Sequence, residues 1–299
     1  MERFIDPRTL ARVKDMPLIA KTVADGFLHG LQQSHQRGIG IEFSQYRNYE
    51  PGDDPGRIDW KLFARSDRYF VREAERESEI GIWFVIDASE SMSQASEQTP
   101  GSWTKFEYAK HLLATLSYLA HRQGDQIGLL AINGRQQTFL PLSAGERQWH
   151  RILKQLTVLE SGDVFPPVKA VKSAIGRLQV PGMVFVISDF YQKSSEVTNF
   201  VKQIATAHTE VVAMQLQCQD EIDFPYQGPI RFEDLESGEQ ILVTAQNARN
   251  SYRKALDGHQ QALRKELSKL RVPLTAINID QAMDQALFDF LDSRRKILR

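Results

Sequence analysis

Short apolar runs and helical patterns alternate along most of this chain. Runs rich in Val, Ile and aromatic residues, such as 81–86 and 180–187, are typical of buried strands. Between such runs, apolar residues recur every three or four positions, as in 104–123, which predicts helices with one face against a core. This alternation predicts an α/β fold, a doubly wound and mostly parallel sheet flanked by helices, of the Rossmann type.

The same patterns predict the order of the elements. Strands are expected at 81–86, 126–132, 136–140 as an edge, 180–187, 210–216 and 273–279. Helices are expected at 104–123, 146–159, 167–178, 194–207, 247–270 and 282–297. A small hairpin insertion is expected near 229–243. We therefore predict an N-terminal helical and irregular segment, 1–78, followed by an α/β domain, 79–299.

Small polar and acidic residues follow two of the expected strands. Asp87, Ser89 and Ser91 follow the first, and Asp189 follows the 180–187 run. The carboxyl ends of parallel strands meet at one edge of a sheet, where ligands bind in open α/β folds. Carboxylate and hydroxyl oxygens suit a hard cation such as Mg²⁺. A strand-ending Asp that caps a turn is the structural alternative, but the second segment favours a divided metal site.

This arrangement resembles the metal-ion-dependent adhesion site of von Willebrand factor A domains, in which Asp-x-Ser-x-Ser follows the first strand and an Asp follows the fourth. The resemblance implies that Asp87, Ser89, Ser91 and, through water, Asp189 hold Mg²⁺ or Mn²⁺, and that a partner's carboxylate completes the shell. That family also takes a Thr from a loop between them. This chain has Asp163 there, with Ser161 as the competing candidate.

The stretch 38–76 points to a narrower family. It contains Tyr46-Arg47-Asn48-Tyr49 and a block at 51–61 that runs from Pro-Gly-Asp-Asp to Asp-Trp-Lys. This block resembles the signature of the proteins grouped as domain of unknown function 58, in which it precedes a von Willebrand-like domain. Members commonly accompany MoxR-type AAA+ ATPases, which implies an adaptor working with such an ATPase.

Acids and bases are finely mixed from Ser34 to Ile80, which indicates an ordered, ion-paired segment docked against a domain. The alternative is a second metal or catalytic cluster formed by Asp53, Asp54 and Asp59.

Composition narrows the function classes. With 299 residues, 41% apolar and 25% charged, the chain can bury a sizeable core. The net charge of −1 lacks the basic footprint of a nucleic-acid-binding protein. The single cysteine, Cys218, excludes an internal disulfide and is expected to be a buried thiol in a reducing compartment. No apolar run suits a signal peptide or a membrane span, so we expect a cytoplasmic protein; the oligomeric state is not indicated.

Enzyme signatures are weak. Gly38-Ile39-Gly40 lacks the third glycine of a dinucleotide loop, a P-loop is missing, and the seven His show no zinc-ligand spacing. The sequence therefore predicts a non-enzymatic, metal-dependent interaction module. The alternative is a metal-dependent hydrolase that uses the same acidic cluster, since divided carboxylates also serve phosphoryl chemistry.

Overall fold

The structure of the protein is a computed structural model. The structure describes residues 15–36, 46–48, 70–72, 80–96, 103–179, 181–193, 195–206 and 208–297. One compact unit holds the described residues up to Phe27 and those from Ile80 onward, and a second holds those between Leu28 and Glu79. In the second unit, β1 (Tyr46–Asn48) pairs antiparallel with β2 (Phe70–Arg72). The block at 51–61, with its Asp53, Asp54 and Asp59, lies outside the described residues.

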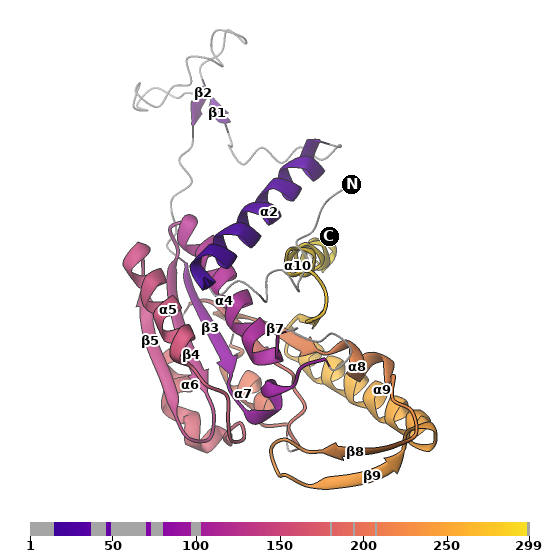
Figure 1. The fold of residues 1–299 in the computed structure, drawn as a ribbon. Helices are drawn as coiled ribbons and strands as arrows, with labels where there is room; N and C mark the ends of the chain where they lie inside the picture. Colours follow the sequence, from indigo (N-terminus) through magenta and orange to yellow (C-terminus); the bar gives the residue numbers. More distant parts are fainter. Residues whose placement is uncertain are drawn as a thin grey trace. The chain divides into compact units, whose positions relative to one another are not determined.

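The larger unit is built on a six-stranded sheet in the order β10-β7-β6-β3-β4-β5 (Figure 1). Its strands are β3 (Gly81–Asp87), β4 (Gln126–Ile132), β5 (Gln137–Ser143), β6 (Gly182–Ser188), β7 (Thr209–Gln217) and β10 (Leu274–Asn278). All neighbours are parallel except β5, which runs antiparallel to β4 at the edge. The predicted α/β class with a mostly parallel sheet is confirmed.

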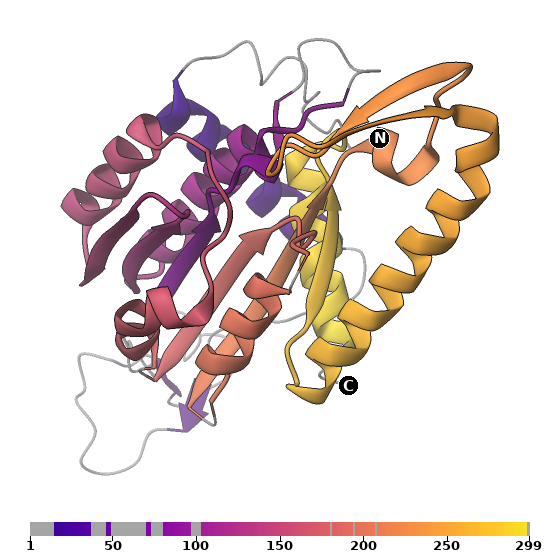
Figure 2. The same ribbon diagram turned by 90° about the horizontal axis from the view of Figure 1, so that it is seen from below.

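Helices lie on both faces of this sheet (Figure 2). One face carries α4 (Lys105–Arg122), α5 (Glu146–Val158) and α10 (Met283–Ile297). The other carries α6 (Lys172–Leu178), α7 (Glu196–Ile204) and α9 (Ala245–Lys269). The helix α2 (Met16–Gln36) begins in this unit, where Phe27 lies 5.1 Å from Phe288 of α10 between ring centroids.

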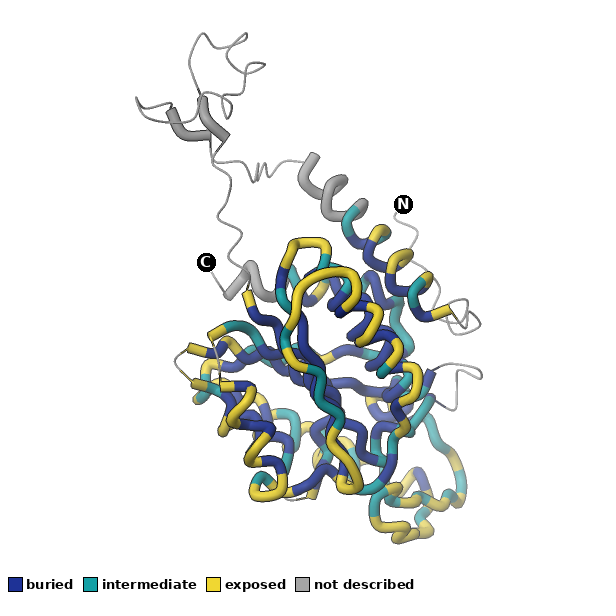
Figure 3. The backbone as a smooth tube through the Cα atoms, turned by 90° about the vertical axis from the view of Figure 1, so that its left-hand side faces the viewer, coloured by how far each residue is buried: buried dark blue, intermediate teal, exposed yellow. Residues whose placement is uncertain are grey.

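The sheet is buried on both faces, which explains its almost continuous apolar runs. Side chains alternate along a strand, so Trp83 and Val85 of β3 join the core under α6, α7 and α9. Phe84, between them, stacks on Phe185 and is fully buried. Figure 3 shows the central strands buried along their length. This packing holds the carboxyl ends of β3 and β6 in place.

Some predicted elements differ in detail. The helix expected at 167–178 begins as a 3₁₀ turn, η3 (Val168–Val171), and α6 starts only after Val171, whose φ of −109° and ψ of 14° depart from helical geometry. A short helix, α8 (Gln219–Asp223), follows β7 and was not expected. The predicted hairpin is confirmed as β8 (Pro229–Glu233) and β9 (Gln240–Thr244). Cys218 is buried, as predicted. Among the described helices, none is both long and apolar enough to span a bilayer.

Candidate metal site

Two of the predicted site acids lie at the same edge of the sheet. Strand β3 ends at Asp87, and β6 ends at Ser188, directly before Asp189. The two strands are parallel neighbours with Ile86 opposite Ile187, so their last residues emerge side by side. Asp87 and Asp189 are each 1% exposed. The fold therefore buries two carboxylates at the edge where ligands enter open α/β sheets.

The Asp87 carboxylate is held by three donors. Its Oδ1 accepts a hydrogen bond from the Ser89 backbone N–H at 2.9 Å. Its Oδ2 accepts from the Ser188 hydroxyl at 2.6 Å and from the Gln192 side-chain amide at 3.1 Å. The same Gln192 nitrogen lies 3.4 Å from Oδ1 of Asp189. One amide thus bridges the two acids and fixes their relative orientation.

Electrostatics at this edge favour an added positive charge. Burial raises the pKa of Asp87 to about 7, and the charge of Asp189 adds to the shift. Hydrogen bonds from Ser188 and Ser89 oppose the rise without cancelling it. Two buried carboxylates repel each other when both are ionised, and a bound cation relieves that repulsion.

The two predicted serines lie in the turn after β3. The 3₁₀ helix η2 (Glu90–Ser93) follows Ser89, and its buried Met92 anchors the turn in the core. The hydroxyls of Ser89 and Ser91 lie 3.1 Å apart. Ser89 is fully buried and Ser91 is half-buried. The structure thus gathers both hydroxyls beside Asp87.

The third predicted loop is tied to this turn through its backbone. Gly162 N–H donates to the Ala88 carbonyl at 2.9 Å, and Glu90 N–H donates to the Asp163 carbonyl at 2.7 Å. The Asp163 carboxylate accepts from Val164 N–H at 2.8 Å and lies 3.9 Å from Nε of Arg135. The Ser161 hydroxyl is 2.7 Å from that of Ser93. Both candidates remain next to the turn, and the choice between them stays a prediction.

Lys105, a fully buried cation at the start of α4, was not predicted from the sequence. Its ammonium lies 3.3 Å from Oδ2 of Asp189 and 2.6 Å from Oε1 of Glu221. It also donates to Gln94 at 3.1 Å and lies 5.0 Å from the Tyr191 ring centroid. Burial alone would lower the pKa of Lys105, but the two facing carboxylates outweigh it and hold the pKa above its usual value. Lys105 is therefore charged and neutralises part of the acidic edge.

A signal for Lys105 does exist in the sequence. It occupies the first position of α4, where the helix dipole favours acids over bases. A lysine in such a place needs another partner, but Glu221 follows it by more than a hundred positions and cannot be paired with it from the pattern alone.

The donor set decides which cations fit. Within the part of the chain that the structure describes, no three His, Cys, Asp or Glu gather so as to hold a metal ion. The candidate site instead offers two carboxylates and two hydroxyls, a set without nitrogen or sulfur. Such oxygens fit Mg²⁺ or Mn²⁺, which accept water for the rest of their shell.

Several known proteins are similar to this chain. It is 26% identical over 298 residues to the uncharacterized protein Rv1480 of Mycobacterium tuberculosis, covering 97% of this chain and 91% of that protein. It is 22% identical over 151 residues to the uncharacterized protein YeaD of Bacillus subtilis, covering 50% of this chain and 34% of that protein.

Two solved structures with a similar chain path are a conserved hypothetical protein and a VWA domain. The conserved hypothetical protein BatB from Bacteroides thetaiotaomicron has 16% identity and a TM-score of 0.42, covering 71% of this chain and 99% of that one. The SpRpn10 VWA domain has 11% identity and a TM-score of 0.38, covering 70% and 93%.

The match that identifies the chain is to a sequence family. The model of the family described as "Protein of unknown function DUF58" matches residues 45–262. This range runs from the start of β1 into α9 and contains both strand ends of the candidate site. The chain belongs to the DUF58 family.

Proposed function

We propose that this protein is a metal-dependent interaction module. Asp87, Ser89, Ser91 and, through water, Asp189 hold one Mg²⁺ or Mn²⁺, which supplies the positive charge that attracts a partner's Glu or Asp. The observation that carries the proposal is the pair of buried carboxylates bridged by the Gln192 amide beside two hydroxyls. Asp189 has Lys105 as a counterion, but Asp87 makes no ion pair among the described residues, and a buried acid without a matching positive charge is costly unless it serves a site.

The charge balance supports a divalent ion. Asp189 and Glu221 face the ammonium of Lys105, and Asp87 lies against Asp189 with no ion pair of its own among the described residues. Three ionised carboxylates and one ammonium leave two negative charges, which one divalent cation would neutralise. Ser188 and Gln192 already hold the Asp87 side chain in place. Binding of the ion would therefore cost little additional side-chain entropy.

The partner that we propose is an acidic surface of a MoxR-type AAA+ ATPase, in keeping with the family resemblance in the sequence. This part of the proposal rests on association between families and not on the geometry of the site. A pull-down with and without chelator, followed by mass spectrometry, tests it. Loss of the ATPase on chelation is expected, whereas its retention would separate partner binding from the metal.

The metal itself is tested by thermal unfolding. Millimolar Mg²⁺ or Mn²⁺ should raise the melting temperature of the wild-type protein by several degrees, because binding to the folded state alone adds about 2.7 kcal/mol at a hundredfold excess over Kd. The Asp87→Ala protein should not respond. Glu107→Gln, which changes a half-buried acid on α4, is the matched control and should respond like the wild type. An equal rise in the melting temperature of the Asp87→Ala protein would contradict the proposed metal site.

A hydrolase using the same acids is the competing activity. We propose that the protein binds without turnover, so p-nitrophenyl phosphate with Mg²⁺ or Mn²⁺ should remain intact. If the wild type releases p-nitrophenol and the Asp189→Ala protein does not, the protein is better described as a hydrolase than as a binding module.

Asp163 is tested separately from the other donors. If its carboxylate enters the shell, the ligands carry one more negative charge than with a Thr hydroxyl. Asp163→Thr should then weaken Mg²⁺ binding in calorimetry but strengthen any metal-bridged contact with a partner carboxylate, because repulsion falls. Unchanged Mg²⁺ affinity would place Asp163 outside the shell and favour Ser161.

A further inference from the structure

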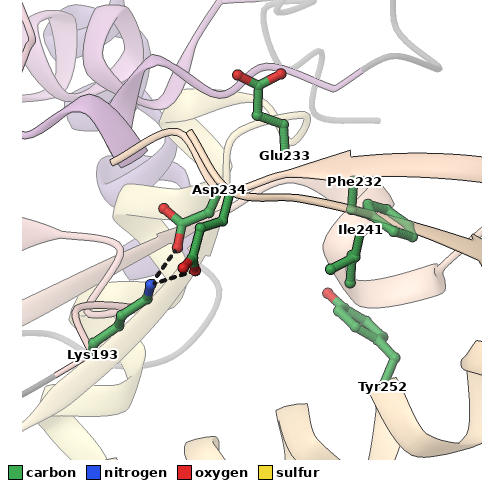
Figure 4. Close-up of a pocket in the computed structure, with 7 residues that line it drawn as sticks. Lys193, Phe232, Glu233, Asp234, Ile241 and Tyr252 are labelled. Atoms are coloured by element: carbon green, nitrogen blue, oxygen red, sulfur yellow. Dashed lines mark hydrogen bonds and ion pairs between the residues drawn. The ribbon is translucent and has the colours of Figure 1, made fainter. Parts of the chain in front are cut away.

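The β8–β9 hairpin has one apolar face and one more polar face. Phe232 lies opposite Ile241 in the strand register, and Arg231 lies opposite Leu242. Cross-strand partners share a face, and neighbours along a strand alternate between faces. Phe232 and Ile241 are therefore on one face, on the side where Figure 4 shows Tyr252 of α9. The hairpin thus turns its apolar face toward α9.

An aromatic cluster supports part of this apolar face. The ring centroid of Phe232 lies 5.7 Å from that of Phe224 and 5.3 Å from that of Tyr226. The Phe224 ring in turn lies 4.7 Å from the ring of Tyr252. The Tyr252 hydroxyl donates a hydrogen bond to the Glu221 carbonyl at 2.8 Å. These contacts fix the positions of the Phe232 and Tyr252 rings.

Ile241 lies beside this cluster but remains largely uncovered. It is 59% exposed. A groove of about 450 Å³ lies against the hairpin, and Phe232, Ile241 and Tyr252 form its apolar lining (Figure 4). Large apolar side chains that converge on a hollow surface, with a few charged groups around them, are typical of binding sites. The groove is therefore a candidate docking surface with an ordered floor.

The charged residues that line the groove are mostly acidic. Asp234 and Glu239 share one ammonium, that of Lys193, at 3.1 and 3.3 Å (Figure 4). The third acid, Glu233, accepts a hydrogen bond from the Gln240 side-chain amide at 3.0 Å. Three acids and one lysine leave two negative charges around the groove. This charge attracts a Lys or Arg side chain and repels nucleic acids and anionic lipid surfaces.

We propose that this groove binds a segment of a partner protein in which a large apolar residue stands next to a Lys or Arg. The apolar side chain packs against Ile241 and Tyr252, and the basic side chain pairs with Asp234 or Glu239. Lys193 is 67% exposed, so its own ion pairs are weak and a partner's cation competes with it at little cost. The inference goes beyond the proposed function, because none of these residues is a proposed metal donor.

A phage library of short random peptides, panned against the full chain in EDTA, tests the proposal without any contribution from a bound divalent ion. The enriched peptides should carry Lys or Arg beside a large apolar residue. Synthetic copies of them should bind Ile241→Ser about tenfold more weakly than the wild type in fluorescence anisotropy. Leu242→Ser is the matched control, because Leu242 is 73% exposed in the same strand but lies on the other face. It should bind like the wild type.

The acidic residues of the groove are tested with the same peptides. Glu239→Gln should weaken their binding by about two- to fivefold and make it less sensitive to salt, because one exposed charge is lost. Glu146→Gln is the control for this change. Glu146 lies on α5 and is 72% exposed, and its replacement should leave binding unchanged.

Three results would overturn the proposal. The first is enrichment of acidic peptides, or no enrichment at all. The second is equal binding by the wild type and Ile241→Ser, because the peptides would then bind elsewhere. The third is a wild-type dimer in analytical ultracentrifugation that Ile241→Ser abolishes, which would assign the groove to a second copy of this chain. All these measurements are made without metal, so any of these results leaves the proposed function standing.

Discussion

Replacing Lys105 with Met should lower the free energy of unfolding by about 3–5 kcal/mol, the usual result of removing one partner from a buried ion pair. The ammonium is fully buried between Asp189 and Glu221, and the Met side chain fills similar space without the charge. Two carboxylates would then be left in the core without their cation. Urea unfolding followed by circular dichroism measures the loss.

Lys110→Met is the matched control for this substitution. Lys110 lies on the same helix and is also largely buried, but its partner Glu107 is 42% exposed and can be solvated when the pair is broken. We expect a loss below about 1 kcal/mol there. Similar losses in the two proteins would show that Lys105 contributes packing and not charge compensation.

The Lys105→Met protein should also bind Mg²⁺ more tightly while it remains folded. The ammonium that neutralises Asp189 is gone, so the acidic edge attracts a divalent ion more strongly. Added Mg²⁺ should therefore restore part of the lost stability, and it should restore more than it adds to the wild type.

The fold was predictable because its signals are local. Apolar runs such as those of β3 and β6 are short, strongly β-forming and bounded by polar turns, and buried parallel strands need little else to be recognised. The start of α6 was not predictable to the residue, since a helical pattern does not distinguish a 3₁₀ turn after Pro167 from the first turn of an α-helix.

The candidate site was predictable only where chain order determines position. Asp87 and Asp189 end adjacent parallel strands, so their meeting at one edge follows from topology, whereas their role as metal ligands stays a prediction. Lys105 and Glu221 come from a helix start and a short helix. Their approach to the site depends on tertiary packing, which leaves no periodic trace in the sequence.

Trp149→Ala should destabilise the protein by about 3–5 kcal/mol without changing its response to metal. Trp149 is 1% exposed and packs α5 against α4, with its Nε1 donating to the Ala114 carbonyl at 3.4 Å and its ring 5.0 Å from that of Tyr118. Lys21 of α2 lies 5.4 Å from the ring centroid. Truncation would open a large cavity and remove all three contacts.

The informative measurement is the melting temperature of Trp149→Ala with and without Mg²⁺, compared with that of Trp149→Phe. The Phe ring keeps most of the volume, so its loss should be smaller. Among the described residues, the printed partners of Trp149 lie on α2, α4 and α5 and not at the candidate site, so both variants should keep the wild-type stabilisation by Mg²⁺ while their melting temperatures fall. A smaller stabilisation by Mg²⁺ in these variants would mean that metal binding depends on general stability. Loss of the Mg²⁺ effect in Asp87→Ala would then no longer show that Asp87 is a metal ligand.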